Sequence, residues 1–135
     1  MSAEKIIRTL LTSAAPVTAL VSTRIFPGEL PQGTTLPAIG LSHITTVEAP
    51  TIDAQAAYTL VQTRVECVAL AKTYAEVKTL ISAIRAACNF QRGTVAGFTV
   101  ISVRRDMVGA DMRDTDMTVF GQTIDFMVTW QEANP

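Results

Sequence analysis

A rigid connection near the start of the chain limits the folds open to this sequence more than any other feature. The segment TRIFPGELPQGTTLPAI, Thr23–Ile39, contains three of the six prolines and two of the seven glycines. Each proline fixes its own φ near about −65° and pushes the preceding residue towards extended geometry. We therefore expect Phe26–Leu36 to be a stiff, mostly extended loop. It either packs as a crossover that fixes helices against a sheet, or presents a rigid edge to a neighbouring molecule.

Apolar residues recur at helical spacing in three segments, which we predict to be helices: Ala3–Ala14, Pro16–Val21 and Thr73–Cys88. The last begins with the sequence TYAE, in which Thr73 and Glu76 form a capping box that satisfies free backbone donors. Ser2 is available as the N-cap of the first helix.

Five extended segments are predicted between and after these helices. In Tyr58–Ala71, which has the clearest alternation, one face is apolar and the other is mixed. The predicted segments are Arg24–Phe26, Pro37–Val47, Tyr58–Ala71, Phe98–Asp106 and Gln122–Trp130. Glu48–Ala57 and Met107–Phe120 are expected to be connections. This order predicts one α+β domain spanning residues 1–135, with a roughly four-stranded antiparallel or mixed sheet and two main helices on one face.

The composition indicates that part of the surface is covered by other subunits. Hydrophobic residues make up 48% of the chain and charged residues 17%, whereas small free-standing domains carry about 25–35% charge on their surface. The net charge is −1, and the lysines and arginines form no cluster of the kind that binds nucleic acid. No run approaches the ~20 apolar residues of a membrane helix, and no secretory signal is evident. We expect synthesis and folding in a cytoplasm, no membrane contact, and reduced core cysteines at Cys67 and Cys88.

The usual signatures of catalysis are missing. His43 lies in a predicted strand without an evident partner, so we expect it on a strand face or at an interface rather than in a catalytic relay. Cys67 falls on the apolar face of its strand, where a thiolate is disfavoured. The glycines of Arg92–Gly97 lack the lysine that ends a phosphate-binding loop. The sequence therefore predicts no enzymatic activity and no cofactor.

One cluster of charges, DMRDTD at Asp111–Asp116, allows several interpretations. Its three carboxylates are suitable ligands for a hard cation, but their spacing does not match an EF-hand loop. The alternatives are a solvated loop and a loop that contacts a partner or lines a conduit. Arg104 and Arg105 precede the cluster and could pair with its aspartates.

The rigid connection also carries a resemblance to a known family. Together with the order of the segments that follow, it resembles the tail-completion or tail-terminator proteins of long-tailed bacteriophages and of gene transfer agents. In that family a motif of this form links the N-terminal helix to the first long strand, usually with tyrosine where this chain has Phe26. The matching residues are Arg24, Ile25, Phe26, Pro27, Leu30, Pro31, Gln32, Gly33 and Pro37.

The resemblance implies a structural virion protein of the tail and neck, assembled in the host cytoplasm. Such a protein forms a homo-hexameric ring that caps the tail tube, ends tail polymerisation and meets the head-closure or connector protein. DNA would pass through the lumen without specific binding, and no cofactor or catalytic residue is expected. Two alternatives are a head-closure, neck or minor tail subunit, and a small cytoplasmic binding domain.

Two segments are candidate interfaces under this interpretation. A stiff loop makes a preformed contact, methionines suit an adaptable docking surface, and an acidic wall does not retain DNA. The candidates are Arg24, Phe26, Leu30, Pro31 and Gln32 in the first segment, and Met107, Asp111, Met112, Arg113, Asp114 and Asp116 in the second. Whether Arg64 and Glu66 pair within one subunit or between subunits is left open by the sequence.

Overall fold

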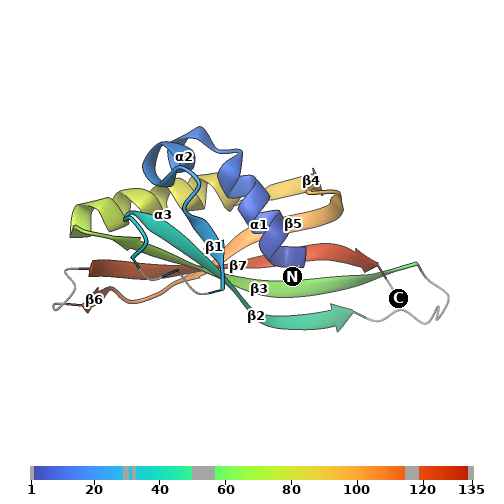
Figure 1. Cartoon of the computed structure of the whole chain (residues 1–135). Coiled ribbons are helices and arrows are strands. Elements are labelled where there is room, and N and C mark those ends of the chain that lie inside the picture. Colours follow the sequence, from blue (N-terminus) through green and yellow to red (C-terminus); the bar gives the residue numbers. More distant parts are fainter. Residues whose placement is uncertain (1, 29–30, 32, 50–56, 115–118, 134–135) are drawn as a thin grey trace.

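Helices cover one face of a curled sheet in the computed structural model of the chain, which describes residues 2–28, 31, 33–49, 57–114 and 119–133 (Figure 1). The described helices are α1 (Ser2–Thr12), α2 (Ala15–Val21) and α3 (Tyr74–Cys88). The described strands are β1 (Ile25–Pro27), β2 (Ala38–Ala49), β3 (Tyr58–Ala71), β4 (Gln91–Val95), β5 (Phe98–Val108), β6 (Met112–Asp114) and β7 (Val119–Ala133). The predicted α+β class is confirmed.

The sheet is larger than predicted. Its described part has seven strands, six of them in the order β1-β2-β3-β7-β5-β4, and β6 pairs with β7 off this path. The pairs are antiparallel except for β1, which runs parallel to β2. The prediction of roughly four strands was wrong because it left out short strands that have no alternating pattern of their own. The short helix predicted at Pro16–Val21 is present as α2, beside the two main helices.

One strand that the prediction left out, β4, forms a hairpin with β5. Its turn residues, Ala96 and Gly97, both have positive φ, at 53° and 83°. Two successive residues of this kind give the tight turn whose twist suits two antiparallel strands. The segment Arg92–Gly97 is therefore a strand and its turn, not an open loop.

Several predicted boundaries also move. β5 continues to Val108 and β7 begins at Val119, so the expected connection Met107–Phe120 is strand at both ends and again in β6. β2 extends to Ala49, two residues into a segment expected to be a loop; residues 50–56 lie outside the described part. Ser2 is the first residue of α1 and not a residue before it.

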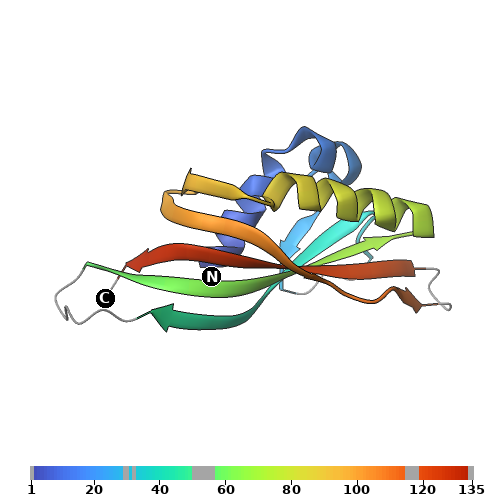
Figure 2. The same ribbon diagram turned by 180° about the vertical axis from the view of Figure 1, so that it is seen from behind.

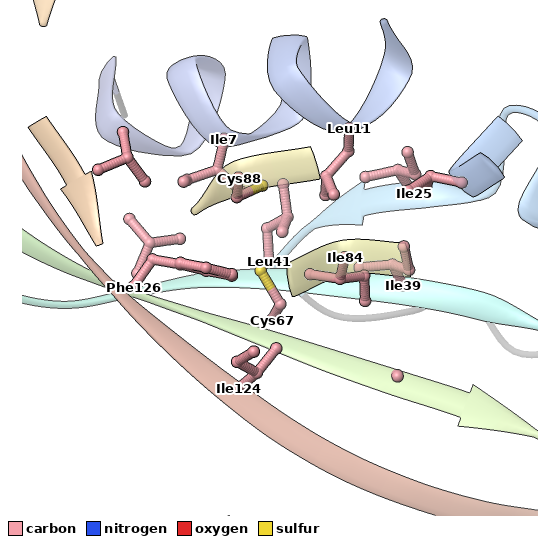
Figure 3. Close-up of a cluster of buried hydrophobic side chains, with 14 of the residues drawn as sticks. Ile7, Leu11, Ile25, Ile39, Leu41, Cys67, Ile84, Cys88, Ile124 and Phe126 are labelled. Carbon is pink, nitrogen blue, oxygen red and sulfur yellow. The ribbon is translucent and has the colours of Figure 1, made fainter. Parts of the chain in front are cut away.

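The hydrophobic core lies between the helices and the covered face of the sheet (Figure 3). The alternation predicted for β3 is confirmed, since its odd-numbered residues from Val61 to Ala71 are buried. Ile7 and Leu11 of α1 and Ile84 of α3 meet them from the helical side. Phe126 of β7 is the largest fully buried side chain of the described residues. The Thr73 half of the predicted capping box is present, because the Thr73 hydroxyl accepts a hydrogen bond from the backbone N–H of Glu76 at 3.2 Å.

The long strands extend past α1 at one end of the sheet and finish beside the start of α3 at the other (Figures 1 and 2). At one end are residues 42–49 of β2 and 58–62 of β3, which we call the arm. At the other end, β5 leads into β6 beside the start of β7 (Figure 2). We call Met107, Val108, Met112 and Arg113 at that end the β6 end.

Replacing Phe126 by alanine tests the core directly. We expect Phe126→Ala to lower the free energy of unfolding by about 3–5 kcal/mol, because it leaves a cavity in the packed centre. Phe90→Ala is the matched control, since Phe90 is 83% exposed, and at concentrations where the protein is monomeric it should change the unfolding free energy by less than about 0.5 kcal/mol. Urea unfolding followed by tryptophan fluorescence measures both, and equal costs would contradict this description of the core.

Candidate functional site

Arg24, the first predicted interface residue, is turned inward. Its Nε donates a hydrogen bond to the carbonyl oxygen of Pro37 at 3.0 Å, and its Nη2 donates to that of Leu20 at 3.3 Å. The backbone N–H of Ile39 donates to the Arg24 carbonyl oxygen at 3.0 Å. The guanidinium therefore ties the last turn of α2 to the start of β2. This supports the crossover interpretation of the rigid connection at this residue.

The remainder of that connection is only partly exposed. Phe26 is half-buried in β1, where it pairs with Gly40, and the N–H of Gly28 donates to the carbonyl oxygen of Leu41 at 2.7 Å. Pro31 is exposed. Leu30 and Gln32 were also predicted as contacts and lie outside the described residues. Among the described candidates of this segment, Pro31 alone offers a fully exposed side chain.

The second predicted interface forms an exposed surface at the β6 end. Met107 is 54% exposed and Met112 is 44% exposed, and Arg113 is exposed beside them. A shallow hollow of about 190 Å³ lies here, lined by Leu70, Met112, Arg113, Val119 and Gly121. Asp114 is the last residue of β6, and Asp116 lies outside the described residues. The structure thus brings Met112 and Arg113 together around an apolar hollow.

Hydrogen bonds to α3 fix the segment that leads to this end. Lys78 Nζ donates to the Asp111 carboxylate at 2.5 Å and to Gln122 Oε1 at 2.9 Å. Gln122 Nε2 in turn donates to the Gly109 carbonyl oxygen at 2.9 Å. The hydrogen bond with Lys78 lowers the pKa of Asp111, and the same bond raises the pKa of Lys78. The Asp111 carboxylate is thus held by an ammonium group, which disfavours a cation site at this residue.

The glycine at residue 109 leaves room for a close approach in the same local arrangement. A Cβ at Gly109 would overlap the hydroxyl group of Thr123, and the Gly109 N–H donates to the Thr123 carbonyl oxygen at 2.9 Å. The close approach of these two backbones lets the chain leave β5 and return as β6 on the same side of β7.

Arg64 makes its ion pairs within the chain. Its Nη1 lies 2.6 Å from Asp106 Oδ2 and 3.2 Å from Asp125 Oδ2, on the face of the sheet that the helices leave open. Asp125 is buried, so Arg64 compensates a carboxylate that has little access to water. Among the described residues of its own subunit, Arg64 therefore pairs with these two aspartates and not with Glu66.

Removing this arginine should destabilise the fold. We expect Arg64→Met to lower the free energy of unfolding by about 1–3 kcal/mol, because it leaves the buried Asp125 carboxylate without its ionic partner. Glu66→Gln is the control on the same strand face and should have an effect below about 0.5 kcal/mol. Chemical denaturation at neutral pH compares the two. An Arg64 variant as stable as the control would show that the ion pairs contribute little.

A pocket of about 300 Å³ lies where the sheet extends past α1. It is lined by His43, Thr46, Glu48, Thr63, Trp130 and Glu132, beside Ala3. We call it the arm pocket. A chain of hydrogen bonds crosses it: His43 Nε2 lies 2.6 Å from Thr46 Oγ1, which lies 3.1 Å from Thr63 Oγ1. Trp130 Nε1 donates to Thr63 Oγ1 at 3.2 Å. His43 is exposed on its strand, as expected.

Sequence reasoning missed this pocket, and it also missed the most exposed large apolar side chain of the described residues, Phe90. The pocket draws its residues from three strands and one helix, so no linear motif marks it. Phe90 follows α3 directly and falls outside the apolar stripe of that helix. The one signal in the sequence for an exposed Phe90 was the position of this apolar residue just after the predicted end of a helix.

Both cysteines are buried in the core as free thiols. Burial raises the pKa of the Cys67 thiol well above its usual value, and it raises the pKa of Cys88 to about 12. A thiol that stays protonated is a poor nucleophile. This confirms the expectation that Cys67 is unsuited to nucleophilic catalysis.

The buried thiols predict a pH dependence of stability. In the unfolded chain a cysteine loses its proton above about pH 8.5, whereas the folded chain keeps it. The folded state therefore binds more protons at alkaline pH. Stability should be unaffected by these groups below about pH 8.5 and fall above it by about 1.4 kcal/mol per pH unit and thiol. Urea unfolding between pH 8 and 10.5 measures the slope, and Cys88→Ala should reduce it; an unchanged slope would contradict the assignment.

Comparisons with known proteins support the family resemblance carried by Thr23–Ile39 and the segments that follow it. The sequence profile described as tail completion protein gp17 matches residues 5–131. A chain of the solved "Virion of native gene transfer agent (GTA) particle" has the same fold, with a TM-score of 0.64 and 15% identity over 94% of this chain and 92% of that one. A search of curated proteins found no match. The chain therefore belongs to the tail completion protein gp17 family and has a structural role in a phage-type tail.

Proposed function

We propose that the chain acts as a single domain that assembles into a hexameric ring on a completed tail tube. The ring ends tube polymerisation and joins the tail to the head-side connector. The observation that carries this proposal is the family match, which spans residues 5–131. The proposed role requires binding and assembly, and no catalytic step.

The shape of the chain supports a joining role. The arm and the β6 end lie at opposite ends of the same sheet, so one subunit can contact two different partners (Figure 1). A chain with a net charge of −1 also suits a conduit through which DNA passes without being retained. No described helix has the length and apolar character needed to span a membrane.

The β6 end is the proposed contact with the tail tube. Its methionines can adapt to a partner, and its apolar hollow is available for a side chain. Hydrogen bonds from Lys78 and Gln122 hold the segment in place before binding, which reduces the entropy lost in the complex.

Charges placed at the β6 end should weaken tube binding. We expect Met107→Glu with Met112→Glu to lower affinity for the tail tube protein by about 10- to 100-fold, because carboxylates would be desolvated in the contact. The control carries Ser82→Glu and Ala86→Glu, which place two carboxylates at exposed positions of α3. Surface plasmon resonance on immobilised tubes compares them. Equal affinities would remove the β6 end from the interface.

The capping role is tested on assembling particles. When the gene is deleted, electron micrographs should show over-long tails separate from heads, and the intact chain should restore a narrow length distribution. Adding the purified chain to polymerising tube protein should stop growth. Tails of normal length that fail to join heads would instead indicate a head-closure or neck subunit. Unchanged particles would contradict a role in the tail and direct attention to the arm pocket as a ligand site.

A further inference from the structure

Exposed large apolar side chains gather at separate places on the described surface. The arm carries Ile44, Val47, Tyr58 and Leu60, and the edge formed by β4 carries Phe90 and Ile101. These two groups lie towards opposite edges of the sheet, because β4 is its last strand and β2 lies next to its first. Two different apolar surfaces on opposite sides of one subunit are what a head-to-tail contact between copies requires.

The backbone of Phe90 has an unfavourable conformation. Its φ is +60°, a conformation that is unusual for a bulky residue. Its backbone N–H donates to the Val103 carbonyl oxygen at 2.7 Å, and the side-chain oxygen of Asn89 accepts from the Arg105 N–H at 3.0 Å. These bonds fix a phenylalanine whose ring is 83% exposed and adds little to the core of its own subunit. Strain of this kind is typical of a residue positioned for a contact.

The charges of the two surfaces are complementary. Phe90, Arg92, Ile101 and Arg104 line one hollow of about 480 Å³, which we call the β4 edge patch. The ion pairs of Arg64 and Lys78 described above do not include its two arginines. The arm pocket presents the opposite charge, because Glu48 and Glu132 line it together with the hydroxyl groups of Thr46 and Thr63. A cluster of carboxylate and hydroxyl acceptors suits the planar guanidinium of an arginine.

Strand edges are available at both surfaces. β1 pairs with β2 only over Ile39–Leu41, so in the described part of the chain residues 42–49 of β2 have no strand on their outer side. β4 likewise has β5 on one side and no described strand on the other. Unpaired edges readily accept another strand. The contact surfaces at both sides thus include backbone donors and acceptors as well as side chains.

We propose that copies of this chain associate head to tail, with Arg92 of one copy in the arm pocket of the next. Phe90 of the first copy packs at the open edge of β2 in the second copy's arm, where Ile44 is exposed at the register shift. The contact rests on the proposed ring function and specifies which surfaces form the ring. Because the surfaces differ, an open assembly keeps one free patch at one end and one free pocket at the other until the ring closes.

Two variants that each lose one surface test the proposal. The patch variant carries Phe90→Ser and Arg92→Ser, and the pocket variant carries Glu48→Arg; Lys72→Glu, at an exposed residue outside both surfaces, is the control. Sedimentation velocity across a wide concentration range should show assembly for the intact chain and the control, and monomers for each variant. At concentrations too low for assembly, thermal unfolding should give melting temperatures close to that of the intact chain, since the changed side chains are exposed.

Mixing the two variants gives the sharpest result. The pocket variant still has an intact patch, and the patch variant still has an intact pocket, so the mixture should form a heterodimer and nothing larger. An intact chain that stays monomeric, variants that assemble like the intact chain, or a mixture without heterodimers would each overturn the contact. The tail-length assay distinguishes this failure from failure of the proposed function. Variants that assemble normally and still cap tails would overturn the contact alone.

Discussion

The pairing of β3 with β7 is the constraint on which the rest of the structure depends. These two strands run antiparallel from Tyr58 opposite Ala133 to Ala71 opposite Phe120, and they form the centre of the sheet. Contacts on both faces of the β3–β7 pair fix its register. A slip of one residue would move the buried apolar set to the open face and bring Arg64 into the core. The ion pairs of Arg64 with Asp106 and Asp125 stabilise the same register from the open side.

The sequence predicted best what is encoded over a long local stretch. The bounds of β3 match the prediction, because its alternation continues through Ala71. α3 is marked equally well, since its apolar stripe follows the Thr73 cap. β4 and β6 carry no such pattern, and their place depends on strands that arrive later in the chain. Contacts such as Lys78 with Asp111 and Arg64 with Asp125 depend on the strand order, which local periodicity does not specify.

The candidate contact surfaces were likewise predicted only in part from the sequence. The motif around Arg24 identified the family, yet the arginine itself serves the subunit interior by joining α2 to β2. A family motif can therefore mark a structural joint as readily as a contact. The low charge of the chain indicated covered surface without locating it. The structure places exposed apolar side chains at the arm, at the β4 edge and at the β6 end, and the first two come from residues that showed no functional signal in the sequence.

The length of the central strands has a mechanical consequence. β3 has 14 residues, which at about 3.3 Å per residue makes a rod of roughly 45 Å from the β6 end to the tip of the arm. Both ends of the subunit therefore belong to the same pair of hydrogen-bonded strands, which fixes the distance between them. The spacing between whatever contacts the two ends is set in steps of two residues, because only an even change keeps the apolar side facing the helices. Homologues that join parts of different spacing would have to lengthen or shorten these two strands together.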